Sequence, residues 1–135
     1  MQIKFHHVGI VVRSIDEQLS YYQGHFGLTL VRPKTFDPLQ DVHVAFLQSG
    51  ESTVLLELIE PASENSPVVN ALNRGGGLNH LCYSVSSLDT AIDHFIGQGS
   101  LLVQPPTPAV AFGGRRIAFL YTALRELVEL VEEKA

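Results

Sequence analysis

The chain has 135 residues, 45% of them apolar, and a formal net charge of −5 at pH 7. This length fits one domain with a buried core, and a negative net charge without any run of Lys or Arg argues against binding to nucleic acids or to anionic membranes. The single cysteine, Cys82, excludes an intrachain disulfide and fits a reducing, cytoplasmic location, and the apolar run at 8–12 is too short for a membrane span or a signal peptide.

The first half of the chain predicts a strand, a helix and three further strands. Ser14 and Glu17 form a capping box, and the apolar residues that follow at helical spacing predict a helix that ends near Gly27. Segments rich in branched apolar residues predict strands at 3–12, 28–32, 42–48 and 53–60.

A connecting segment then leads into a second half with the same order of elements. Ser66 and Pro67 predict the cap and first position of a short helix at 66–74, which ends at the glycines 75–77. A strand at 78–85, a helix from the cap Ser87 to about Gln98, and strands at 101–103, 116–121 and 126–132 follow, with a long loop predicted across the prolines and glycines of 105–114. We therefore expect one α+β domain over residues 1–135, with modules at about 3–60 and about 78–133.

The two halves are related by an internal repeat. An offset of 73 residues places His7 on His80, and an offset of 72 places the stretch 57–60 on the stretch 129–132. Each half therefore carries a histidine in its first predicted strand and a glutamate in its last.

These repeated residues predict a metal site. A single histidine in a strand is usually structural, but a glutamate in an apolar strand is costly to bury without a partner, and chance is a poor explanation for both features in both halves. The predicted metal ligands are His7, Glu57, His80 and Glu129. Imidazole and carboxylate together bind one divalent ion of Co, Ni, Mn or Zn, as well as Fe, without selecting one of them. Such an ion, with positions left for substrate oxygens, acts as a Lewis acid that stabilises an enolate.

Alternation along a strand predicts the roles of the neighbouring residues. His6 should point to the face opposite His7, and Glu60 and Glu132 should face solvent. The candidate catalytic groups are Glu57, Glu129 and His43. His43 lies on a predicted strand, where a structural role is commoner for a histidine.

Four stretches resemble the vicinal oxygen chelate superfamily, which includes glyoxalase I, methylmalonyl-CoA epimerase, ring-cleaving dioxygenases and bleomycin-binding proteins. They are Phe5–Val12, Leu56–Pro61, Gly76–Leu81 and Leu127–Glu132. The resemblance implies two βαβββ modules that form an eight-stranded cup around a metal ion, with the four residues named above as its ligands.

Within that superfamily, the connecting segment and the stretch 113–120 resemble methylmalonyl-CoA epimerases. This resemblance implies an epimerase or isomerase that acts at the carbon alpha to a thioester carbonyl through a metal-bound enolate, with acid/base groups on opposite faces. Two departures stand out. Leu39 occupies the place of the second catalytic glutamate of epimerases, and the stretch 124–126 replaces a usual glycine.

Three other functions remain open. A glyoxalase-like lyase on a thiol hemithioacetal would use its ligand glutamates as bases and would tolerate Leu39. A non-enzymatic drug-binding protein would usually lack the ligands, and an extradiol dioxygenase favours two His and one carboxylate in a longer chain. The expected partners are a small substrate, such as an acyl-CoA or a thiol adduct, and a second copy in a homodimer. Candidates for contacting a substrate phosphate are Arg32, Lys34, Arg74, Arg115 and Arg116.

Overall fold

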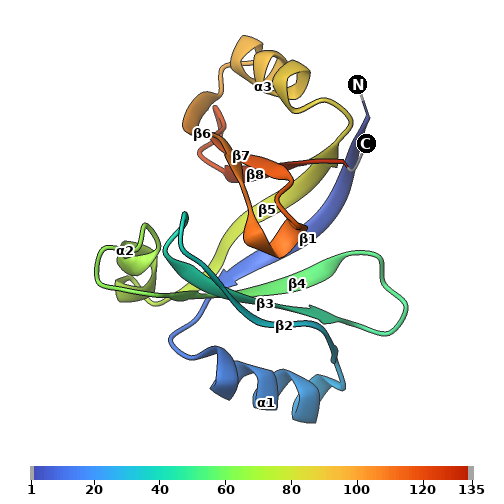
Figure 1. The fold of residues 1–135 in the computed structure, drawn as a ribbon, viewed down its shortest axis with the longest axis vertical. Helices are drawn as coiled ribbons and strands as arrows, with labels where there is room; N and C mark the ends of the chain where they lie inside the picture. Colours follow the sequence, from blue (N-terminus) through green and yellow to red (C-terminus); the bar gives the residue numbers. More distant parts are fainter. Residues whose placement is uncertain (1, 134–135) are drawn as a thin grey trace. The chain divides into compact units, whose positions relative to one another are not determined.

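The computed structural model describes residues 2–133 and contains the β-α-β-β-β order twice (Figure 1). The first module consists of β1 (Ile3–Val11), α1 (Ile15–Phe26), β2 (Thr29–Asp37), β3 (Val42–Gln48) and β4 (Leu55–Pro61). A short helix, α2 (Val69–Asn73), precedes the second module. That module consists of β5 (Gly77–Val85), α3 (Leu88–Gly97), β6 (Leu101–Pro108), the 3-10 turn η1 (Val110–Phe112), β7 (Arg116–Tyr121) and β8 (Leu127–Glu132). The predicted α+β class and its repeated modules are confirmed.

The strands of each module are hydrogen-bonded in equivalent orders. Over the described residues, the eight-stranded sheet runs β2-β3-β4-β1-β5-β8-β7-β6, so that β2 and β6 are its edges. In each module the first strand pairs in parallel with the last, as β1 with β4 and β5 with β8, while the other pairs within a module are antiparallel. This parallel pairing brings residues about 50 positions apart in sequence onto neighbouring strands. None of the described helices is both long and apolar enough to cross a membrane.

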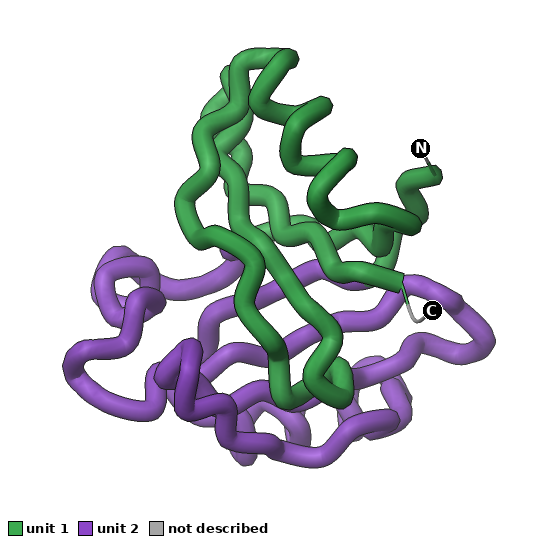
Figure 2. Tube along the Cα trace, turned by 45° about the horizontal axis from the view of Figure 1, so that its top comes forward, with its two compact units in different colours: residues 1–6, 80–135 green, residues 7–79 purple. Residues whose placement is uncertain are grey.

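The chain divides into two compact units whose boundaries coincide with the repeat (Figure 2). Unit 2 is His7–Asn79, and unit 1 takes the described residues up to His6 and from His80 onward. In unit 2, α1 covers one face of its strands through a core built around Ile15, Leu47 and Leu58. In unit 1, α3 does the same through a core that includes Leu88, Leu120 and Leu130. Burying each such side chain contributes about 1.5–3 kcal/mol.

Both edge strands are longer than the sequence predicted, because each continues through prolines. Proline is tolerated on edge strands and at bulges, and the pairing register shifts near Pro33 in β2 and near Pro105 in β6. The hydroxyl of Thr35 donates to the carbonyl of Pro33, and that of Thr107 to the carbonyl of Pro105, both at 2.8 Å. The loop predicted to begin at Pro105 is therefore wrong for residues 105–108, which belong to β6.

The connecting segment also differs from the prediction at its start. α2 begins at Val69 with Val68 as its N-cap, and Ser66 instead accepts a hydrogen bond from the Val68 amide, at 3.4 Å, in the preceding turn. The predicted end is correct. Gly76 has φ +69, and a Cβ there would lie 2.7 Å from the carbonyl oxygen of Val11, so only glycine fits this close approach.

Candidate functional site

The first predicted ligand pair meets inside unit 2. The Nε2 atom of His7 on β1 lies 3.2 Å from Oε1 of Glu57 on β4, and the two side chains are 0% and 8% exposed. Parallel pairing of β1 with β4 produces this approach. Gly9 is the register partner of Glu57, and His7, two residues before Gly9 on β1, shares its strand face. The ring of Phe46, the register partner of Glu57 on β3, packs edge-on against His7 at 5.2 Å. The pair is therefore shielded from solvent, and the orientation of the His7 ring is held by an aromatic neighbour.

The second predicted pair repeats this geometry inside unit 1. Nε2 of His80 on β5 lies 3.0 Å from Oε1 of Glu129 on β8, with side chains 2% and 5% exposed. The ring of Phe119 packs edge-on against His80 at 5.3 Å, and Phe119 is the register partner of Glu129. Phe46 and Phe119 are themselves separated by 73 residues. The repeat offset could have identified both aromatic residues, which the sequence reasoning missed.

The donor chemistry of both pairs fits a divalent metal ion. Burying a carboxylate is costly unless it is paired or coordinates a metal, and each module buries one beside an imidazole nitrogen. Nitrogen and oxygen donors of this kind suit Co, Ni, Mn and Zn. Each pair supplies two ligand atoms, one from a histidine and one from a glutamate.

Glu60 and Glu132 are only partly exposed, with side chains 19% and 30% accessible, and both have partners within the fold rather than facing solvent freely as predicted. Oε1 of Glu60 accepts a hydrogen bond of 2.9 Å from the amide of Ile15, the first residue of α1, and its Oε2 lies 3.7 Å from Nζ of Lys34. Glu132 accepts two hydrogen bonds from Arg116, at 2.7 and 3.2 Å. The hydrogen bond from Arg116 is the main cause that lowers the pKa of Glu132 below its ordinary value. Alternation gave the correct strand face, but α1 and Arg116 cover these positions.

The structure does not bring His43 to the ligand pair of its own unit. His43 is the register partner of Glu60 on β4, whereas Phe46, beside His7, is the partner of Glu57. Because residues three apart on a strand point to opposite faces, His43 lies on the face that α1 covers. Its ring packs against Phe36 at 5.2 Å.

The turn that carries Leu39 is held by a buried carboxylate. Asp37 is 1% exposed and accepts hydrogen bonds from the amides of Leu39 and Gln40 and from the Gln40 side chain, at 3.0, 3.3 and 2.7 Å. Leu39 itself is 64% exposed. Asp41, which ends the turn with φ 56, accepts a hydrogen bond from the hydroxyl of Ser63. The turn thus presents an apolar side chain at the position where the resemblance to epimerases predicts a proton-transfer group.

His6 also departs from the prediction. The ring of Phe5 packs against that of Tyr83 at 5.2 Å, and Tyr83 belongs to the face that α3 covers. His6 and Cys82, the adjoining residues, therefore lie on the other face of unit 1, which also bears His80. Alternation predicts that His6 points to the face opposite His7, but a ring nitrogen of His6 lies within 4.8 Å of a ring nitrogen of His7, so that prediction is wrong.

Three of the five candidate phosphate-binding cations have partners within the fold. Lys34 lies near Asp16 and Glu60, and Arg116 pairs with Glu132 and lies 3.6 Å from Asp89. Arg115 donates to the backbone carbonyls of Phe112 and Glu132, at 3.2 and 3.3 Å. These contacts give each of the three a structural role.

Comparisons with known proteins agree with this architecture. The family model described as the Glyoxalase/Bleomycin resistance protein/Dioxygenase superfamily matches residues 6–119. The uncharacterized protein YqjC of Bacillus subtilis is 37% identical over 133 residues, covering 95% of this chain and 91% of that protein. The mitochondrial methylmalonyl-CoA epimerase of Dictyostelium discoideum is 28% identical over 135 residues, covering 96% and 78%. The crystal structure of methylmalonyl-CoA epimerase from Mycobacterium tuberculosis superposes with a TM-score of 0.87 at 31% identity, covering 98% of this chain and 89% of that one.

Proposed function

This chain belongs to the glyoxalase/bleomycin resistance protein/dioxygenase superfamily, and from that premise we propose that it is a metal-dependent epimerase or isomerase acting at the carbon alpha to a thioester carbonyl. The observation that carries the proposal is the pair of buried histidine and glutamate side chains present in each module. The similarity to methylmalonyl-CoA epimerases supports an acyl-CoA as the substrate class.

In this proposal one divalent ion is held jointly by His7, Glu57, His80 and Glu129. Two carboxylates offset the charge of the ion, and two neutral imidazoles complete a ligand set suited to Co, Ni, Mn or Zn. When bound, the ion would supply a Lewis acid that stabilises the negative charge developing on the thioester oxygen.

The proton chemistry falls to the side chains of the chain. Epimerisation requires a proton to leave one face of the alpha carbon and another to arrive on the opposite face, so two groups are needed. A carboxylate oxygen of Glu129 or Glu57 can take the proton while the electron pair of the C–H bond moves into the enolate. Leu39 cannot return a proton. His43 and Asp41, which lie within a few residues of it, are the candidates for the second group; the ring of His43 packs against Phe36 and Asp41 accepts a hydrogen bond from Ser63. We therefore expect proton exchange to be faster than inversion.

Leu39 also supports a second candidate, a glyoxalase-like lyase acting on a hemithioacetal, because the ligand glutamates would serve as its bases. Four ligands in two intact pairs argue against a purely drug-binding protein. We also expect a homodimer, which light scattering of the purified protein tests directly.

The test compares exchange with inversion in one sample. Metal-reconstituted protein is incubated with methylmalonyl-CoA in deuterated water, and deuterium uptake and loss of optical purity are followed together. Leu39→Glu should raise inversion more than exchange. Leu39→Gln, similar in size but unable to transfer the proton, is the matched control and should not.

Each contrary result is informative. Fast inversion by the unmodified chain, undiminished by replacing both His43 and Asp41 with alanine, would show that the second proton-transfer group lies elsewhere. Hemithioacetal turnover without exchange would establish the lyase. Absence of both activities in metal-loaded protein would contradict an enzymatic role on either substrate.

A further inference from the structure

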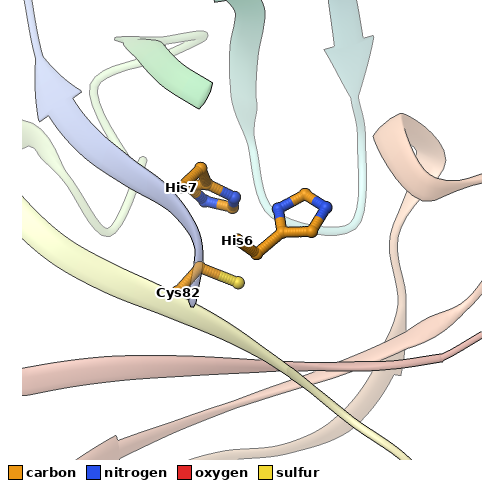
Figure 3. Close-up of side chains that lie close together, drawn as sticks. All are labelled: His6, His7 and Cys82. Carbon is orange, nitrogen blue, oxygen red and sulfur yellow. The ribbon is translucent and has the colours of Figure 1, made fainter. Parts of the chain in front are cut away.

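We propose that His6 and Cys82 form a second metal site in unit 1, selective for thiophilic ions and chemically distinct from the histidine–glutamate pairs. A ring nitrogen of His6 on β1 and the sulfur of Cys82 on β5 lie within 4.8 Å of each other. Figure 3 shows the two side chains together with His7, the next residue of β1. The proposal does not rest on the proposed function.

The packing around His6 fixes the direction of its ring. The Phe5 and Tyr83 rings pack together on the α3 face, which directs His6 and Cys82 to the other face. The His6 ring packs edge-on against Phe112 at 5.4 Å, and the guanidinium of Arg115 lies over the Phe112 ring at 5.6 Å. Cys82 is fully buried, whereas His6 is half-buried, so an ion would enter from the side of His6.

The distance between the donors is close to what one small ion requires. Zinc binds sulfur at about 2.3 Å and imidazole nitrogen at about 2.0–2.1 Å in a tetrahedral arrangement, which places the two donor atoms about 3.6 Å apart. Donor atoms that lie within 4.8 Å of each other therefore need to approach by about 1.2 Å at most. On binding, the S–H bond breaks, its proton passes to solvent and a metal–sulfur bond forms.

The donor types set the selectivity. A thiolate with an imidazole favours soft and borderline ions such as Cu(I), Zn(II) and Cd(II), whereas imidazole with carboxylate lacks a soft donor. Cys82 is the register partner of Glu129 and lies two residues from His80 on the same strand face. The two kinds of site are thus neighbours in unit 1, and the experiment must separate them.

The experiment titrates reduced, metal-free, full-length protein with Cd(II) and records thiolate-to-metal charge-transfer absorption. Cys82 is the only cysteine in the sequence, so any such band reports on this residue. In the native protein the band should reach full intensity at no more than one equivalent of Cd(II) per chain. In Cys82→Ser it should be absent. His6→Ala should weaken binding at least about tenfold. His94→Ala, which removes an exposed histidine of α3, is the matched control and should leave the titration unchanged.

Three results would overturn the proposal. One is absence of the band in native protein whose circular dichroism shows it to be folded. Another is equal affinity in His6→Ala and the native chain, which would show that the thiol binds without the imidazole. The third is loss of the band in Glu129→Ala, which would assign Cys82 to the histidine–glutamate ligands; a retained band supports a separate site.

Discussion

Replacing Glu60 with alanine should destabilise the fold without affecting metal binding. Oε1 of Glu60 accepts a hydrogen bond of 2.9 Å from the amide of Ile15, and Ile15 is fully buried. Ser14 is the N-cap residue of α1, and Glu60 satisfies a further amide of its first turn. Loss of a side chain that accepts from such an amide costs about 0.5–2 kcal/mol, and a buried donor left without its partner costs about 1–3 kcal/mol. The contact with Lys34, a side chain 36% exposed, adds at most a few tenths of a kcal/mol. We expect a loss of about 1–2 kcal/mol.

This loss corresponds to a measurable shift in the melting temperature. One kcal/mol shifts the Tm by about 4–8 °C in domains of about 60–100 residues and by about 2–4 °C in those of about 150–250 residues. A chain of intermediate length should therefore lose about 3–10 °C. Thermal and urea denaturation followed by circular dichroism measure the effect, and an unchanged urea m-value shows that the loss is one of stability. Glu60→Gln keeps an oxygen acceptor and should lose less.

Metal content measured on the same samples tests the assignment of the two acidic residues of β4. Glu60→Ala should retain the ion that Glu57→Ala loses. A Tm unchanged in Glu60→Ala would show that the Ile15 amide does not depend on this carboxylate. Loss of metal from Glu60→Ala at unchanged stability would show that Glu60, rather than Glu57, is the ligand.

Three further predictions follow from the histidine–glutamate pairs and from Glu132 of β8. Elemental analysis of the native protein should find about one divalent ion per chain. Replacement by alanine of any one proposed ligand (His7, Glu57, His80 or Glu129) should lower that metal content, whereas His94→Ala should not. Full metal retention by a His80→Ala, Glu129→Ala double variant would exclude the site. Chelation should lower the Tm, since a ligand at a hundred times its Kd stabilises the native state by about 2.7 kcal/mol; no shift in protein known to be loaded would show that the four residues do not hold the ion in the native state. The hydrogen bond from Arg116 lowers the pKa of Glu132. The stability that Glu132 contributes is therefore present above about pH 4.3 and is lost as the pH falls through its folded-state pKa. The difference in unfolding free energy between the native chain and Glu132→Gln should shrink in acid, and a difference that stays constant with pH would refute this prediction.

The histidine–glutamate pairs could be predicted from the sequence because two rare features occurred twice at one spacing. A buried glutamate and a strand histidine are each weak signals, but parallel pairing of the first and last strands of a module brings them into contact in both modules. Phe46 and Phe119 repeat with the same offset and were still missed, because a phenylalanine in an apolar strand is unremarkable by its type alone. Their role depends on the cross-strand partner, which the structure supplies.

The errors arose where neighbouring elements decide the outcome. Prolines at 105–108 predict a break, yet an edge strand needs hydrogen bonds along one side only and can continue through them. Alternation placed Glu60 on the correct face of β4 but could not show that the first amide of α1 lies there. The same rule failed for His6, which alternation directs away from His7, although a ring nitrogen of each lies within 4.8 Å of the other.

The residue at position 39 illustrates why a fold can be predicted more easily than a reaction. Asp37 holds the turn through the backbone amides of residues 39 and 40 and through the Gln40 side chain, and none of these bonds involves the side chain of Leu39. The backbone of the turn therefore keeps its shape with leucine, glutamine or glutamate at this position, and an exposure of 64% leaves room for each. The paired histidine and glutamate side chains are constrained from several sides at once by burial and by strand pairing. Under the proposed function, the second proton-transfer group would be constrained only by its backbone, so we expect one substitution at this position to change the reaction while the modules and their histidine–glutamate pairs stay the same.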